Sequence, residues 1–258
     1  MDYLIFSLLG LIFGSFFNVV INRLPYGKSI VFPGSACPKC GQEVRWYDNI
    51  PVISYILLNG RCRNCGLKIS FQYPFVEIIT AVITVWLYVK YGMSILFVKY
   101  FILCGLLLCA GIIDLNTALD DNFETGIIPD ELSLGGIPVG LIFGFIEKSL
   151  LISIIGGIIG FLLLFIPGFV YKLVTGKEGM GGGDIKLFAM IGTFLGYKPL
   201  FFILFISSFL GAVIGLFFIH IYKRRDYPIP FGPFISLASI IYIFYGEEII
   251  QSYLKMIL

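Results

Sequence analysis

The chain has 258 residues, of which 58% are hydrophobic and only 13% are charged, and its mean hydropathy is +0.95. A soluble domain carries about 25% charged residues, so this composition excludes an ordinary soluble enzyme and predicts a polytopic protein of the lipid bilayer. The net charge of +2 gives no reason to expect a nucleic-acid partner.

Eight apolar segments predict membrane helices, because a backbone in lipid must satisfy its hydrogen bonds within a helix. They cover approximately residues 3–21, 74–90, 95–113, 132–147, 150–172, 185–197, 199–222 and 229–246. If the break at 196–199 is only a kink, the count falls to seven and the C-terminus changes sides. The expected fold class is an all-α polytopic membrane protein with about eight transmembrane helices and a small cytoplasmic zinc-ribbon-like domain.

The distribution of basic residues predicts the orientation in the membrane. Arg23 and Lys28 follow the first apolar segment, which indicates a retained span with its N-terminus outside rather than a cleaved signal peptide. In this orientation 13 of the 18 Lys and Arg residues are cytoplasmic, including those of a short turn at 223–228, as the positive-inside rule requires. We expect three parts: a first transmembrane helix at 1–21, a cytoplasmic domain at 22–73 and a transmembrane domain at 74–258.

Four cysteines form two Cys-x2-Cys pairs in the cytoplasmic segment, and they are Cys37, Cys40, Cys62 and Cys65. This spacing predicts a structural zinc site, because four thiolates complete a tetrahedron and leave no open coordination position. Two disulfides or a redox pair are the alternatives, which a reducing cytoplasm disfavours. The two remaining cysteines lie within the third apolar segment, where we expect packing.

Two aspartates lie at the cytoplasmic ends of apolar segments. Asp114 ends the third segment, and Asp184 opens the sixth directly after three glycines. A carboxylate suits a helix N-terminus but not a C-terminus, so the helix dipole explains Asp184 and not Asp114. If the two carboxyl groups meet, they share one proton and can act as base and acid on a peptide bond. The single histidine, His220, lies in an apolar segment, and no catalytic arrangement can be built on it.

The chain resembles the bacterial type IV prepilin peptidases, which are membrane aspartic peptidases of the GxGD type. The resemblance runs nearly end to end and rests on ordered motifs: 14–21 (GSFFNVVI), 23–25 (RLP), the two Cys pairs, 46–51 (WYDNIP), Glu77, 181–187 (GGGDIKL) and 230–233 (PFGP).

This resemblance implies an enzyme of the bacterial inner membrane that cleaves the leader of type IV prepilins and pseudopilins at the cytoplasmic face. It implies catalysis by Asp114 and Asp184, a structural zinc ion, and N-methylation of the new N-terminus with S-adenosylmethionine. Residues 43–55 are candidates for the methyl-donor site only through the resemblance, and packing against the membrane face explains them equally well. The oligomeric state and the particular pilin stay open.

One departure from the family pattern concerns the first aspartate. The family usually has a Pro-Asp or Pro-Asn about half a dozen residues after it, whereas fourteen residues separate Asp114 from Pro129. An insertion at about 116–125 would explain the difference. We favour Asp114 because its apolar flank fixes its depth, and keep Asp120, Asp121 and Asp130 as alternatives.

Two other classes of function remain. A non-enzymatic zinc-ribbon membrane adaptor would share the architecture but be indifferent to both aspartates. A transporter would carry its acidic residues near the bilayer midplane rather than at the edge.

Overall fold

A computed structural model describes residues 2–222 and 230–257, so the basic turn expected at 223–228 lies outside the described residues. Within these ranges the regular structure is helical, and the strand-like pairings are two isolated bridges. The chain divides into two compact units, Met1–Phe101 and Ile102–Leu258.

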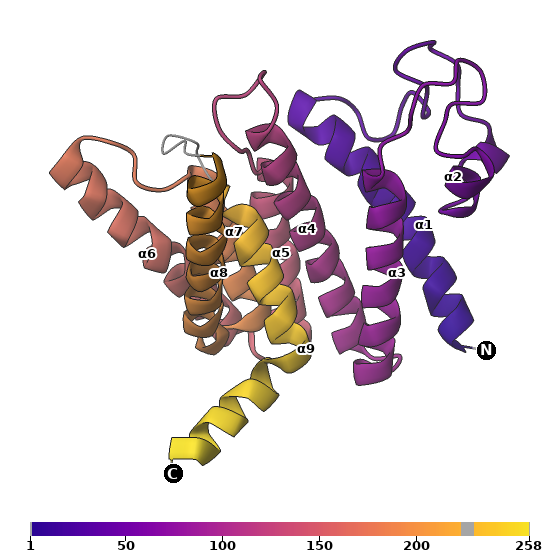
Figure 1. The fold of residues 1–258 in the computed structure, drawn as a ribbon. Helices are drawn as coiled ribbons and strands as arrows, with labels where there is room; N and C mark the ends of the chain where they lie inside the picture. The colour runs from indigo at the N-terminus through magenta and orange to yellow at the C-terminus, as the bar shows by residue number, and fades with distance from the viewer. Residues whose placement is uncertain (1, 223–229, 258) are drawn as a thin grey trace. The chain divides into compact units, whose positions relative to one another are not determined.

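In the first unit, helix α1 (Asp2–Arg23) packs along helix α3 (Gln72–Tyr91) (Figure 1). Glycines make this contact close: a Cβ added at Gly10 would lie 2.5 Å from Cα of Ala81, and one at Gly14 would lie 2.6 Å from Cα of Glu77. Small residues four apart let membrane helices approach at their backbones. Polar side chains on neighbouring turns of α1 therefore face α3 directly.

The segment between these helices carries the cysteines and contains two 3-10 turns and one short helix. The turns are η1 (Leu24–Tyr26) and η2 (Trp46–Asp48), and the helix is α2 (Ile53–Leu57). Arg23 at the end of α1 donates hydrogen bonds to the carbonyls of Ser29, Pro33 and Gly34 at 2.8–3.0 Å. These bonds fix the start of the segment on the end of the helix.

The second unit contains most of helix α4 and five further helices: α4 (Ile95–Ala118), α5 (Asp130–Ile146), α6 (Leu150–Thr175), α7 (Gly182–Leu195), α8 (Lys198–Tyr222) and α9 (Gly232–Ile257). Helix α7 contacts α5, α6, α8 and α9, and every residue from 187 to 194 is buried (Figure 1). This helix is the core of the unit.

Glycines also set the packing of α7 against α6. An added Cβ at Gly192 would lie 2.1 Å from the carbonyl oxygen of Gly156, and one at Gly160 would lie 2.5 Å from the carbonyl oxygen of Phe188. With 14 residues, α7 is about 21 Å long, which is shorter than the roughly 30 Å hydrocarbon core. Its neighbours rather than lipid therefore surround it.

The expected all-helical fold is confirmed for the described residues. Gly196 has φ +76° and follows the last residue of α7, so the predicted break between the sixth and seventh segments is a true helix end. By length and composition, five described helices can cross a membrane, namely α1, α3, α4, α6 and α8. The protein is a multi-pass membrane protein, and the count of eight crossings stays a prediction.

Candidate active site

Asp114 lies in the last two turns of α4 and is 4% exposed. Its Oδ2 accepts a hydrogen bond of 2.9 Å from the backbone N–H of Gly232, the first residue of α9. Two glycines leave room for the carboxylate: a Cβ at Gly126 would lie 2.2 Å from Oδ1, and one at Gly232 would lie 2.6 Å from Oδ2. The carboxylate is therefore held in a pocket that only glycine can line at these two positions.

The loop after α4 returns to the aspartate because Thr117 fastens it. The Thr117 hydroxyl accepts a 2.8 Å hydrogen bond from the N–H of Ile127 and donates 2.8 Å to the carbonyl of Ile113. This bond brings residues 126–128 back against the end of α4. The residues in between make an exposed excursion, which begins with an Asp120–Asn122 turn bonded at 3.0 Å.

Asp184 lies in the first turn of α7, as expected from the glycine run before it. Its Oδ2 would be 3.1 Å from a Cβ at Gly181, so the carboxyl group folds back toward the helix N-terminus. Its Oδ1 is buried and has no hydrogen-bond partner among the described residues. A helix N-terminus favours a negative charge there, and the buried oxygen is available to another group.

The two aspartates belong to one site. Ile128 lies between them: its Cδ1 would be 3.0 Å from a Cβ at Gly232, and its Cβ would be 3.0 Å from one at Gly183. The end of α4, the start of α7 and the start of α9 thus converge on two carboxyl groups.

The alternative acids have different surroundings. Asp121 is exposed. Asp130 is exposed and forms an ion pair of 2.7 Å with Lys186. Asp120 caps its own turn through the side chain of Asn122 at 2.7 Å. Of these candidates only Asp114 is buried beside Asp184, which supports the choice made from its apolar flank.

Sequence reasoning missed two residues of this site. Gly126 directly follows the segment interpreted as an insertion, where nothing in the sequence distinguishes it from a loop glycine. Gly232 belongs to a recognised motif, but its role as the donor to Asp114 needed the fold. Both could have been suspected because glycine, which has no side chain, lets the backbone come close to a carboxylate.

The four predicted cysteine ligands come together in the first unit. Their sulfur atoms all lie within 4.8 Å of one another, and Sγ of Cys37 is 3.7 Å from Sγ of Cys65. In a tetrahedral site with Zn–S bonds of about 2.3 Å, sulfurs are about 3.8 Å apart. An isolated bridge flanks each pair, Ala36 with Glu43 and Arg61 with Lys68. The donor set and its spacing fit a zinc ion.

The surroundings of two of the four thiols favour metal binding, whereas the pKa of Cys65 is raised to about 11, against the effect of a backbone hydrogen bond from Leu67, by desolvation and by its hydrogen bonds with the other three thiols. Hydrogen bonds, above all from the backbone of Gln42, lower the pKa of Cys40 to about 6. Backbone hydrogen bonds from Cys65 and Asn64 also lower the pKa of Cys62. The thiolate is the form that binds metal, so these hydrogen bonds stabilise the metal-binding form of Cys40 and Cys62.

Two family models match the chain: the bacterial peptidase A24 N-terminal domain over residues 8–91, and the type IV leader peptidase family over residues 101–216. The chain is 35% identical to the prepilin leader peptidase/N-methyltransferase of Pseudomonas aeruginosa, over 96% of this chain and 92% of that protein. It is 34% identical to the proteins of the same name from Pseudomonas putida (97% and 93%) and Aeromonas salmonicida strain A449 (100% and 97%). No solved structure matches the chain significantly.

The apolar helices and the two family models define a membrane-embedded peptidase. The matches are more particular, since they cover nearly the full length of the chain and of each relative. The chain belongs to the type IV leader peptidase family, and it is an enzyme of the prepilin peptidase and N-methyltransferase kind.

Proposed function

We propose that the chain cleaves the leader peptide from type IV prepilins and pseudopilins at the cytoplasmic face of a bacterial inner membrane, and then methylates the new N-terminus. The observation that carries the peptidase half is the convergence of Asp114 and Asp184. Relatives of nearly equal length named for both activities support the pairing of cleavage with methylation.

Each carboxyl group has a feature that can support its charge: the N–H of Gly232 for Asp114, and the N-terminus of α7 for Asp184. When the two carboxyl groups come within hydrogen-bonding distance of each other around the substrate, they cannot both ionise, so they hold one proton between them. The ionised group takes a proton from a water molecule as that water attacks the scissile carbonyl carbon. The protonated group donates its proton to the carbonyl oxygen.

Collapse of the tetrahedral intermediate breaks the C–N bond, the leaving amine receives a proton from the acid pair, and the pair takes one proton back from a hydroxyl of the intermediate as the new C=O bond forms. The reaction consumes one water molecule and leaves the pair with its single proton, ready for the next cycle. A substrate with a charged leader and an apolar helix would present this bond at the membrane edge, where the ends of α4 and α7 are expected from the sequence.

The cysteine cluster would hold a zinc ion in a structural role, because its four thiolates fill the coordination sphere. When bound, S-adenosylmethionine supplies the methyl group for the amine that cleavage exposes. The new amine must lose a proton before or during this transfer, since only the free amine has a lone pair for the methyl carbon.

Mass measurement of a prepilin peptide after incubation with the purified protein tests both halves. We expect cleavage without S-adenosylmethionine, and a further gain of one CH2 on the pilin product when it is present. Asp114→Asn and Asp184→Asn should each abolish cleavage, whereas Asp130→Asn should retain it because that carboxylate is exposed and paired with Lys186. Cleavage by either of the first two variants would refute the assignment of Asp114 and Asp184 as the catalytic pair.

A further inference from the structure

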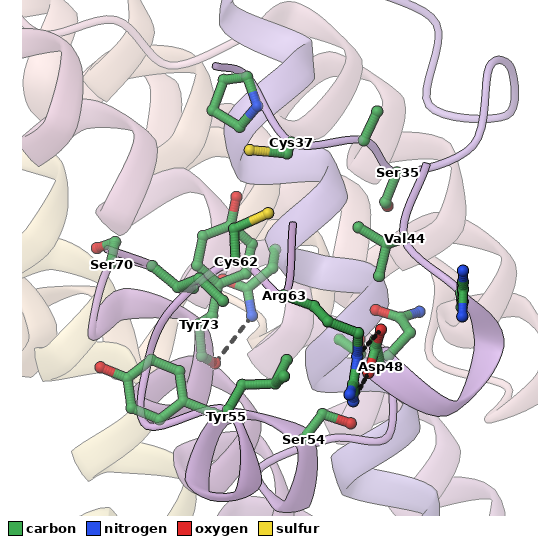
Figure 2. A pocket seen from close by; sticks show the side chains of 18 of the residues that line it. Ser35, Cys37, Val44, Asp48, Ser54, Tyr55, Cys62, Arg63, Ser70 and Tyr73 are labelled. Carbon is green, nitrogen blue, oxygen red and sulfur yellow. Dashed lines mark hydrogen bonds and ion pairs between the residues drawn. The ribbon is translucent and has the colours of Figure 1, made fainter. Parts of the chain in front are cut away.

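The first unit contains a pocket of about 700 Å³ between α1, α3 and the cysteine-bearing segment (Figure 2). Pockets of about 300–1,000 Å³ accommodate small organic ligands. In Figure 2 the side chains of Asp48 and Arg63 turn toward each other on its wall, where they form a bidentate ion pair at 2.6–3.1 Å. This ion pair is neutral as a unit, and the other charged side chains that line the pocket are Arg23, Glu43, Arg45, Lys68 and Glu77.

The floor of the pocket carries a buried carboxylate. Glu77 on α3 is 7% exposed, and its Oε2 accepts a 2.7 Å hydrogen bond from the N–H of Val52. Ser15 on α1 also interacts with this carboxylate, and both residues line the pocket. An acidic side chain within a membrane helix is costly, so it indicates a function that needs it.

Next to Glu77 lies an acceptor that the protein does not use. Asn18 is 1% exposed, and its Nδ2 donates to the carbonyls of Gly14 (3.2 Å) and Tyr73 (3.0 Å). Because the nitrogen must face these two carbonyls, the amide orientation is fixed and Oδ1 is the free atom. Oδ1 is buried without a partner among the described residues. Buried acceptors normally have donors, so a ligand that brings one would complete the site.

The backbone beside this floor is also unusual. Val52 has φ 61°, a conformation that β-branched residues rarely adopt and that functional sites often hold. This geometry aims its N–H at Glu77 and holds the segment before α2 over the pocket. The strain is consistent with a segment shaped for a ligand rather than for its own stability.

We propose that this pocket binds S-adenosylmethionine, with the positively charged end of the molecule on the floor made by Ser15, Asn18 and Glu77. The proposal rests on the methyltransferase half of the proposed function and gives that half a site. A carboxylate beside an unpaired carbonyl oxygen suits a cation that donates hydrogen bonds, and the methyl donor carries both an ammonium and a sulfonium. Tyr55 and Tyr73 line the same pocket, and an aromatic ring there could stack on the adenine.

Glu77 and Asn18 lie about 7.5 Å inside the ends of their helices, five residues from Gln72 and from Arg23. This is close to the level at which a membrane helix meets water.

Equilibrium binding of radiolabelled S-adenosylmethionine to the purified full-length protein tests the site. Glu77→Gln keeps an acceptor for Val52 but removes the charge, and it should weaken binding at least tenfold. Val19→Trp places a large ring on the α1 wall of the pocket and should abolish binding. Ile12→Trp makes the same change on an exposed position of α1 and should bind as the wild type does. Bound metal and melting temperature verify that each variant is folded.

S-adenosylhomocysteine, which lacks the sulfonium charge, provides a second arm. Weaker binding of both molecules to Glu77→Gln places the ammonium on the floor, and weaker binding of the methyl donor alone places the sulfonium there. Wild-type affinity in both folded pocket variants would overturn the proposed site. No binding to a wild-type protein that still cleaves prepilin would overturn the site and the methyltransferase half together, while leaving the peptidase half standing.

Discussion

Replacing Gly126 with alanine tests whether the position of the Asp114 carboxylate matters for cleavage. The new Cβ would lie 2.2 Å from Oδ1 of Asp114 and 2.8 Å from its backbone oxygen. Real Cβ atoms stay at least 3.0 Å away from such atoms, so the carboxylate oxygen must move by about 0.8 Å. Oδ2 is meanwhile held by the N–H of Gly232, so the group cannot simply rotate away.

A misplacement of about 1 Å in a catalytic group can reduce the rate about 100-fold. We therefore expect kcat/KM for a prepilin peptide, measured by mass spectrometry of the products, to fall about 100-fold in Gly126→Ala. That change corresponds to about 2.7 kcal/mol of lost transition-state stabilisation. The loss should appear in kcat rather than KM, because the contacts that bind the apolar helix of the substrate are unchanged.

Gly135→Ala is the matched control, since a Cβ at that position meets nothing within 4 Å. Alanine also favours a helix over glycine by about 1 kcal/mol, so this variant of α5 should be at least as stable as the wild type. Both variants should retain their bound metal, because the cysteines lie in the other unit. If Gly126→Ala cleaves within threefold of Gly135→Ala, the carboxylate position inferred for Asp114 is wrong.

Two further predictions concern the metal site and the core of the second unit. Cys40→Ala should lose the zinc ion, about one per chain in the wild type, and its cysteine segment should be cut more readily by protease. The control is Cys104→Ala, in the buried part of α4, which should retain the metal. Equal metal content of the two variants by atomic emission would contradict the site. Gly192→Ala would place a Cβ 2.1 Å from the carbonyl oxygen of Gly156, and it should lower the free energy of unfolding by about 1–3 kcal/mol. The melting temperature in detergent should therefore be lower than that of Gly135→Ala. An unchanged melting temperature would show that α6 and α7 can separate without loss of stability.

The sequence predicted the helices well because lipid restricts what a backbone can do. Each of the eight apolar segments corresponds to a helix of the structure. The ends of seven lie within about five residues of those expected, whereas α9 continues to Ile257 rather than ending near residue 246. The break at Gly196 could be recognised because a glycine followed closely by a proline ends a helix. The pairing of the helices was not predictable, since it depends on which small residues face each other, as Gly14 faces Glu77 and Gly192 faces Gly156.

The cysteine cluster was the most predictable part of the candidate sites. Two Cys-x2-Cys pairs can form a common site from local turns alone, and the structure brings all four sulfurs together. The pocket beside them was not predictable. Its floor combines residues of α1, α3 and the strained Val52, and residues 43–55 supply only part of its wall.

The first aspartate shows most clearly what a fold adds to a motif. Counting along the sequence made Asp114 doubtful, because fourteen residues separate it from Pro129. In the structure the extra residues leave and return between two fixed points, Thr117 and Ile127, which are joined by a 2.8 Å hydrogen bond. The position of the Asp114 carboxylate is therefore set by the Thr117–Ile127 hydrogen bond and by the N–H of Gly232. The number of residues in the loop between Thr117 and Ile127 does not affect it. Shortening the loop between residues 119 and 125 should therefore leave cleavage intact as long as the Thr117–Ile127 hydrogen bond survives. Thr117→Val removes that hydrogen bond without changing the loop length, and it should reduce cleavage.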